Sequence, residues 1–199
     1  MTINRKKVAS SVLGAYSSAR NSYANALAAD RYDLAMNAGN KPVTFTNKIV
    51  GVERKQNAAS EIYQAHDAAL SAIDAELAKA SRAMTEPPTD EAARFIIAIS
   101  SRDNLSEDEV MAALDRYHGH AVEKAILSAA SRSGLRGFPT TTAAENDVSD
   151  LRELAGAVDR FITPSNIETA TDGKSALIEN MFTQFGEGAA MNDLAAMLG

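Results

Sequence analysis

The sequence contains neither cysteine nor tryptophan. Without thiols the chain has no disulfide, no thiolate nucleophile and no cysteine-based zinc site. Only 6% of the residues are aromatic, which argues against a row of aromatic side chains on which nucleic-acid bases stack. No apolar run approaches the roughly 20 residues of a membrane-spanning helix, and residues 1–40 hold no signal-peptide core. We therefore expect no membrane partner and a cytoplasmic location in the producing cell.

Alanine is abundant, with 38 of the 199 residues. It has the highest helix propensity of the amino acids, and its small side chain lets helices approach closely. The hydrophobic content of 45% is ordinary for a globular protein. The composition therefore favours an all-α fold.

Charge is distributed unevenly along the chain, whose net charge is −6. Residues 1–60 hold nine Lys and Arg against three Asp and Glu, whereas residues 61–199 hold eleven against twenty-three. A basic beginning is typical of contact with nucleic acid or with an acidic partner, but it also lets two parts of one chain attract each other. We favour attraction within the chain or between copies, and we do not expect strong nucleic-acid binding because the body is acidic.

A long helix is predicted over residues 46–84. From Ile49 to Met84 its seam positions alternate at intervals of three and four residues, which is the pattern of a helix that buries one narrow face. Leu70, Ile73 and Leu77 form the most apolar part of this seam. We predict that they bind another helix, either of this chain or of a second copy, because the heptad pattern fits both.

A second helix is predicted near the N-terminus. Apolar residues from Val8 to Leu27 recur at intervals of four and three, and Asn4 precedes them as a cap. Asn37 to Pro42 has the composition of a turn. Residues 1–86 are therefore expected to form a helical hairpin or coiled-coil region.

A small three-helix module is predicted over residues 89–135. Pro87 and Pro88 end the long helix, and a helix over residues 90–100, rich in isoleucine on nearly all sides, is expected to be buried. Ser106 and Glu109 form a capping box for the next helix. The third helix runs from His120 to Arg132, between two glycines.

Two stretches of this module, 105–114 (LSEDEVMAAL) and 119–126 (GHAVEKAI), resemble the last two helices of ubiquitin-associated (UBA-like) domains. The resemblance covers residues 89–133 and implies a three-helix fold and an adaptor that binds a protein partner. The family includes a module of a bacterial translation factor, so the fold does not require ubiquitin. Ubiquitin-binding members carry Met-Gly-Phe where this chain has Asp103-Asn104-Leu105, which argues against ubiquitin as the partner.

Residues 145–199 are predicted to form amphipathic helices. One begins at a cap on Asn146 or Asp147 and ends at Thr163-Pro164, and another runs from Lys174 to Phe185. After the joint Gly186-Glu187-Gly188, three apolar residues at helical spacing form a short segment: Met191, Leu194 and Leu198. We expect this tethered segment to dock on a protein partner, with folding back onto its own chain as the alternative.

The sequence predicts no catalytic, cofactor-binding or metal-binding residue. Gly173-Lys174-Ser175 has the ending of a phosphate loop, but Glu168 stands where that loop requires glycine. His66 lies on the seam of the long helix, where a histidine at the edge of the core with a hydrogen-bond partner is expected. Asp115, His118 and His120 are close in sequence, but no second ligand cluster accompanies them.

These observations favour a non-enzymatic helical structural or assembly protein. In style it resembles the small alanine-rich structural proteins of tailed phages, such as scaffolding, internal or connector proteins. This resemblance makes the virion a second expected location. Its expected partners are another protein or a second copy of itself. The alternatives are a UBA-like adaptor and a nucleic-acid binder that uses the basic N-terminal region.

Overall fold

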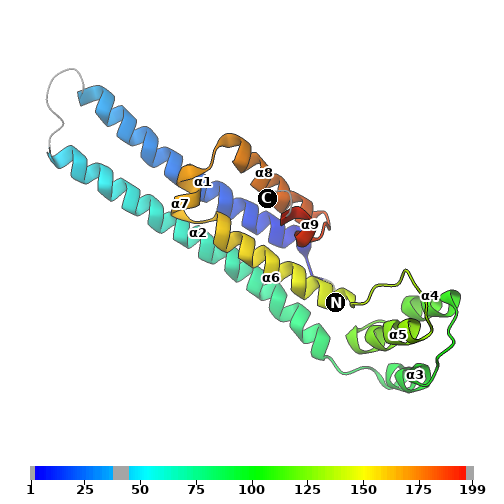
Figure 1. The fold of residues 1–199 in the computed structure, drawn as a ribbon. Coiled ribbons are helices and arrows are strands. Elements are labelled where there is room, and N and C mark those ends of the chain that lie inside the picture. The colour runs from blue at the N-terminus through cyan, green and yellow to red at the C-terminus, as the bar shows by residue number, and fades with distance from the viewer. Residues whose placement is uncertain (1–2, 38–44, 196–199) are drawn as a thin grey trace. The chain divides into compact units, whose positions relative to one another are not determined.

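A computed structural model of the chain describes residues 3–37 and 45–195. These residues form the helices α1 to α9 and contain no strand, which confirms the predicted all-α class (Figure 1). The chain divides into two compact units. One consists of Met1–Ile3 and Ala75–Arg152, and the other of Asn4–Asp74 and Glu153–Gly199.

The second unit is built on a hairpin of two long helices. α1 spans Arg5–Asn37 and α2 spans Phe45–Thr85, and the part of α2 up to Asp74 belongs to this unit. The carboxamide oxygen of Asn4 accepts a hydrogen bond from the Lys7 N–H at 3.0 Å, so Asn4 caps α1 as predicted. The turn expected at Asn37 to Pro42 lies mostly outside the described residues.

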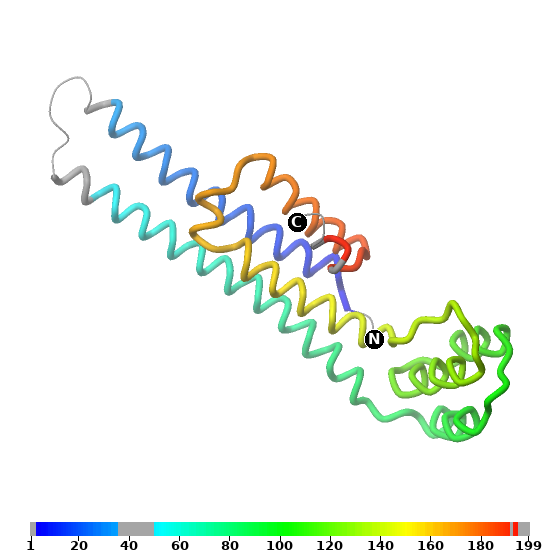
Figure 2. The backbone as a smooth tube through the Cα atoms, in the orientation of Figure 1, coloured from blue at the N-terminus to red at the C-terminus, as the bar shows by residue number. Residues whose placement is uncertain are grey.

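Two ion pairs hold the helices of the hairpin to each other. A guanidinium nitrogen of Arg54 in α2 lies 2.5 Å from a carboxylate oxygen of Asp33 in α1, and 3.6 Å from one of Asp30. α1 and α2 run antiparallel, as the tube drawing shows (Figure 2). These contacts set the register of the hairpin, because they place Arg54 next to Asp33 and one helical turn from it, next to Asp30.

Four further helices complete the second unit: the end of α6 (Ala143–Phe161), and then α7 (Pro164–Thr169), α8 (Asp172–Gly186) and α9 (Met191–Ala195). α8 packs along α1. The Tyr16 ring meets the Phe182 ring edge-on, with centroids 6.2 Å apart. The fully buried large side chains of this unit come from α1, α2, α6, α8 and α9 and from the residue after α6: Val8, Tyr16, Ile62, Ile73, Leu154, Ile162, Ile178, Phe182, Phe185 and Met191.

The buried face of α2 differs in register from the predicted seam. Ala58, Ile62 and Ala69 are buried, whereas the neighbouring seam residues Val52 and Tyr63 are 55% and 57% exposed. The buried stripe therefore lies one residue before the predicted one over this part of the helix. The alanines let a neighbouring helix approach closely, which turns the larger seam residues to the flank.

The other unit contains the predicted three-helix module, formed by α3 (Asp90–Ser100), α4 (Glu107–Arg116) and α5 (His120–Arg132). The capping box of α4 is confirmed: Ser106 Oγ accepts from the Glu109 N–H, and the Glu109 carboxylate accepts from the Ser106 N–H. The core of the module joins residues of all three helices and the loop between the first two: Ala92, Ile99, Leu105, Val110, Ala113, Val122, Ile126, Ala129 and Ala130.

Two local expectations are wrong. The side chain of Ile97 is 74% exposed, so α3 is not buried on all sides; with few helices around it, α3 keeps one face in solvent. α6 begins at Ala143 and not after Asn146. Its cap is Thr142, whose hydroxyl accepts from the Glu145 N–H at 3.2 Å while the Glu145 carboxylate accepts from the Thr142 N–H at 2.9 Å.

The division into units differs from the three regions expected from the sequence, which were 1–86, 89–135 and 145–199. Pro87 and Pro88 lie between α2 and α3, so they end the long helix as predicted. The compact units nevertheless divide within α2 and α6. α2 and α6 are long enough to contribute side chains to the cores of both units. The prolines mark the end of a helix, but they do not mark the residue at which one core ends and the other begins.

Candidate docking surface

A groove of about 310 Å³ runs between α3 and α4. Residues at positions i, i+3, i+4 and i+7 line it on each side, which is the spacing of one helical face. The lining residues are Phe95, Ala98 and Ile99 of α3, Arg102 and Leu105 of the loop that follows it, and Glu109, Ala112, Ala113, Arg116 and Tyr117 of α4 and its end.

The floor of the groove is apolar. Ile99, Leu105 and Ala113 are buried there and belong to the core of the module. Ala98 and Ala112 are exposed on its rim, and their small side chains leave the space between the helices open. An apolar side chain from outside would contact a floor without polar side chains, and its burial is worth roughly 1.5–3 kcal/mol.

An aromatic pair closes one end of the groove. The rings of Phe95 and Tyr117 stack with their centroids 4.1 Å apart and their planes at 19°. The guanidinium of Arg116 lies 5.2 Å from the centroid of the Tyr117 ring and donates to Glu91 at 3.0 Å. This end therefore presents aromatic edges, with a cation that already has a carboxylate partner.

An ion pair closes the other end. Nη2 of Arg102 donates to Oε1 of Glu109 at 2.8 Å. The Ser106 N–H, which donates to the same carboxylate, and then Arg102 lower the pKa of Glu109 below its ordinary value. Because Arg102 pairs with Glu109 and Arg116 pairs with Glu91, both arginines at the groove have a carboxylate partner, and the rim carries balanced charge.

The groove is held in shape by the loop between α3 and α4. The Leu105 N–H donates to Oγ of Ser133 at 2.9 Å, which ties the loop to the end of α5. Nη2 of Arg132 donates to the Ser100 carbonyl at 3.2 Å, which ties α5 to the end of α3. A groove fixed in this way needs little ordering when a ligand enters, and ordering is a main cost of binding.

The predicted seam residues are buried to different degrees. Ile73 is fully buried, and Leu70 and Leu77 are half-buried. Ile73 therefore serves the core of its own unit and is not an exposed anchor. A role of the three residues in association between chains stays a prediction.

The predicted C-terminal docking segment requires a correction. Met191 is fully buried and Leu194 is 2% exposed, so both belong to the core of their own unit. α9 contacts α8, and the Arg5 guanidinium of α1 donates to the Ala189 carbonyl just before α9, at 3.3 Å. The segment folds back because α8 and the start of α1 offer it a surface. Leu198 lies outside the described residues.

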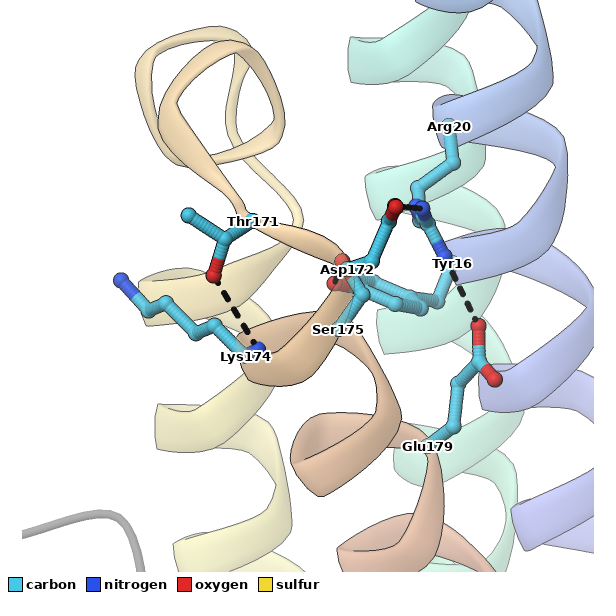
Figure 3. A network of polar contacts seen from close by, with 7 residues as sticks. All are labelled: Tyr16, Arg20, Thr171, Asp172, Lys174, Ser175 and Glu179. Carbon is cyan, nitrogen blue, oxygen red and sulfur yellow. Dashed lines mark hydrogen bonds and ion pairs between the residues drawn. The ribbon is translucent and has the colours of Figure 1, made fainter.

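The segment Gly173-Lys174-Ser175 lies in the first turn of α8, where it serves a polar network between α8 and α1 (Figure 3). The Thr171 hydroxyl caps the helix by accepting from the Lys174 N–H at 3.3 Å. The Tyr16 hydroxyl and Oγ of Ser175 share a hydrogen bond of 3.2 Å in the core. Burial is the main reason why the pKa of Tyr16 is raised.

Three arginines of the basic N-terminal region are engaged within the chain. Arg5 stacks its guanidinium over the Phe185 ring, with 5.2 Å to the centroid. Arg20 contacts carboxylate oxygens of Glu179 and Asp172 in α8, both at 3.3 Å, and Arg54 contacts α1 as described above. These contacts fit attraction within the chain, which the charge distribution suggested, and they leave fewer cations for phosphate.

Among the described residues, no group of three or more His, Asp or Glu side chains is arranged to hold a metal ion. Nε2 of His66 lies 2.9 Å from Oδ1 of Asp159 in α6, so His66 has the hydrogen-bond partner that was expected. Nδ1 of His120 lies 2.9 Å from the Thr142 hydroxyl. No helix in the described part of the chain is long and apolar enough to span a membrane.

The chain was compared with models of protein families, with curated proteins and with solved structures, and none of them matches it. The resemblance of residues 89–133 to UBA-like domains therefore stays a prediction. So does the resemblance in style to phage structural proteins.

The groove between α3 and α4 was not predicted from the sequence. Part of its signal was present, because α3 carries Phe95, Ala98 and Ile99 at i, i+3 and i+4, and α4 carries the small residues Ala112 and Ala113. The stacking of Phe95 on Tyr117 was hidden, since 22 positions separate them in the sequence and only the packed module brings them together.

Proposed function

We propose that this protein is a non-enzymatic helical assembly protein that docks a protein partner in the groove between α3 and α4. The observation that carries the proposal is the preformed apolar groove, with alanines on its rim and paired charges at its ends. Its volume of about 310 Å³ suits one or two large apolar side chains. An amphipathic helix that places Leu, Met or Phe on one face is the partner that fits it best.

The experiment is affinity purification of the tagged full chain from its native source, with the wild type and two variants compared. Ala112→Arg fills the groove from its rim. Met111→Arg introduces the same side chain on the opposite face of α4, where Met111 is 55% exposed, and serves as the matched control. We expect a protein that co-purifies with the wild type and with Met111→Arg, and that is reduced at least tenfold with Ala112→Arg.

Two results would contradict the proposal. If the partner is retained equally by Ala112→Arg, the groove is not its docking site. If no protein co-purifies with the wild type, the adaptor role itself loses its support. Circular dichroism of both variants before the purification establishes that each one is folded.

We extend the proposal to the setting expected from the sequence, a structural component of a tailed-phage virion. Its support is the likeness of style, which consists of a long heptad-patterned helix, a small helical module and a high alanine content. Mass spectrometry of purified particles tests this setting. A chain absent from the particles removes the virion from the proposal but leaves the docking groove to be judged by the variants above.

A further inference from the structure

A second cavity lies in the same compact unit as the three-helix module, between α5 and residues 133–142, which connect α5 to α6. Its volume is about 390 Å³, which is within the range of small-molecule sites in proteins. We name it the α5 pocket. It is lined by Lys124, Leu127, Ser128, Ser131 and Arg132 of α5, and by Leu135, Phe138, Pro139, Thr140 and Thr142 of the connecting segment.

One wall of the α5 pocket is a single face of a helix. Counted from Lys124, the lining residues of α5 occupy positions i, i+3, i+4, i+7 and i+8, which lie on the same side of an α-helix. Leu127 is buried and forms part of the floor, whereas Ser128 and Ser131 are exposed at the rim. Lys124 and Arg132 stand at opposite ends of this wall, about 12 Å apart along the helix axis.

The opposite wall is tied to α5 at both of its ends. At one end the chain turns through Gly134, whose φ of 73° is left-handed, and the Leu135 N–H donates to the Ala130 carbonyl at 3.1 Å. At the other end, Nδ1 of His120 lies 2.9 Å from the Thr142 hydroxyl. The pocket is therefore formed before a ligand arrives, which spares the cost of ordering the chain on binding.

The floor of the α5 pocket is apolar. Leu127 is 6% exposed, and Leu135 and Phe138 are partly buried against the core of the module. Pro139 adds a further apolar surface to the lining. An aromatic ring or a short alkyl chain of a ligand would lose contact with water on these side chains, which favours binding.

The charged side chains of the lining are all basic. The lining contains two cations, Lys124 and Arg132, and no acid. Each cation has a carboxylate partner outside the lining. Nζ of Lys124 lies 2.8 Å from Oε1 of Glu145, and Nε of Arg132 lies 3.5 Å from Oδ1 of Asp103. These carboxylates hold the two cations in place without lining the pocket themselves.

Arg132 is the more available of the two cations, because its carboxylate partner is farther away. A guanidinium has five N–H donors. The described contacts of Arg132 use three of them, since Nη1 donates to Oγ of Ser128 and Nη2 to the Ser100 carbonyl, both at 3.2 Å, and Nε faces Asp103. Two donors are left for a ligand.

We infer that the α5 pocket binds a small organic anion. Its apolar or aromatic body lies on the floor formed by Leu127, Leu135 and Phe138, and its carboxylate or phosphate group lies at Arg132. A planar guanidinium matches the oxygens of either group. Ser131 lines the same pocket next to Arg132, and its hydroxyl has no hydrogen-bond partner among the described residues, so it supplies a further donor. This inference does not depend on the groove between α3 and α4.

NMR titration of the ¹⁵N-labelled full chain with four small probes tests the inference. Phenyl phosphate and benzoate each combine a ring with an anion and distinguish phosphate from carboxylate. Inorganic phosphate offers the charge without the ring, and benzyl alcohol offers the ring without the charge. We expect saturable shifts at the amides of residues 127–140 with phenyl phosphate, with benzoate or with both, and binding at least tenfold weaker for the other two probes.

Two matched variants locate the anion. Arg132→Gln and Arg136→Gln each remove one positive charge, but Arg136 is exposed and is not part of the lining. Ser131→Phe fills the pocket from its exposed rim. We expect Arg132→Gln and Ser131→Phe to bind the organic anion at least tenfold more weakly, and Arg136→Gln to bind it like the wild type. The amide spectrum of each variant shows whether it is folded.

Several results would overturn the inference. One is the absence of saturable shifts at residues 127–140 with both organic anions. Another is binding of benzyl alcohol or of inorganic phosphate as tight as that of the organic anions, because the site would then not require both parts of the ligand. Undiminished binding by folded Ser131→Phe would place the anion elsewhere. Equal weakening by Arg132→Gln and Arg136→Gln would show an effect of net charge and not of a site.

Discussion

The buried hydrogen bond between Tyr16 and Ser175 predicts an uneven response to mutation. Both side chains are fully buried, one on α1 and the other on α8, and their oxygens are 3.2 Å apart. In Tyr16→Phe, the Ser175 hydroxyl can turn to the Thr171 carbonyl one turn earlier in its own helix. In Ser175→Ala, the phenol is left in the core without a partner, and a buried unpaired polar group is the more costly outcome.

The magnitudes follow from this difference. We expect Tyr16→Phe to lower the free energy of unfolding by about 1 kcal/mol, the usual net value of one hydrogen bond. Ser175→Ala should lower it by about 2–3 kcal/mol. The double variant places two apolar side chains against each other, so it should cost about 1 kcal/mol less than the sum of the single variants.

Urea unfolding followed by circular dichroism measures all three variants, with Tyr32→Phe as the control. Tyr32 is 64% exposed, and the loss of its hydroxyl should leave the stability unchanged. The reasoning fails if the double variant costs as much as the two single variants together, because the two hydroxyls would then not interact. It also fails if Tyr16→Phe is the more destabilising of the two.

The remaining predictions concern α8 and α6. Gly186→Ala should destabilise by roughly 1–3 kcal/mol in thermal unfolding, because the new Cβ would lie 2.7 Å from Cβ of Ala9. Gly156→Ala, with nothing within 4 Å, should stabilise by about 0.5–1 kcal/mol. Lys124 and the Thr142 N–H lower the pKa of Glu145 to about 2. Glu145→Gln should therefore destabilise at neutral pH.

The sign for Glu145 follows from linkage. Its carboxylate has a lower pKa in the folded chain than in the unfolded chain, so it stabilises the fold above pH 4.5. That contribution is lost as the pH falls from about 4.5 to 2. The difference in unfolding free energy between the wild type and Glu145→Gln should shrink over this range, and a difference independent of pH would contradict it. For the glycines, a stabilising Gly186→Ala would show that α1 and α8 do not touch there.

The helices of the three-helix module were predictable because local signals define them. The capping box at Ser106 and Glu109, the prolines after α2 and Gly119 before α5 act over a few residues, and the structure has each helix boundary where these signals place it. The start of α6 was missed although it has the same signal. Thr142 and Glu145 also form a capping box. The residues before them have the composition of a loop, which favours a later helix start.

The proposed docking surface was less predictable, since it depends on how helices pack. The sequence indicates that α3 and α4 each have an apolar face, but not that Ala98 and Ala112 leave a groove between them. In the same way, Met191 and Leu194 have the same helical spacing whether they dock on a partner or fold back onto their own chain. Only the position of α9 against α8 decides that they are buried in their own chain.

The register of α2 shows how alanine content affects the packing of the hairpin. A heptad analysis places the largest apolar residues at the centre of the contact, but in this hairpin Ala58 and Ala69 lie at the centre and Tyr63 lies on the flank. Small residues permit a close approach of two helices, and the large residues beside them then form a second apolar surface. α6 uses that surface, because Nε2 of His66, on the same flank of α2 as Tyr63, lies 2.9 Å from Oδ1 of Asp159 in α6.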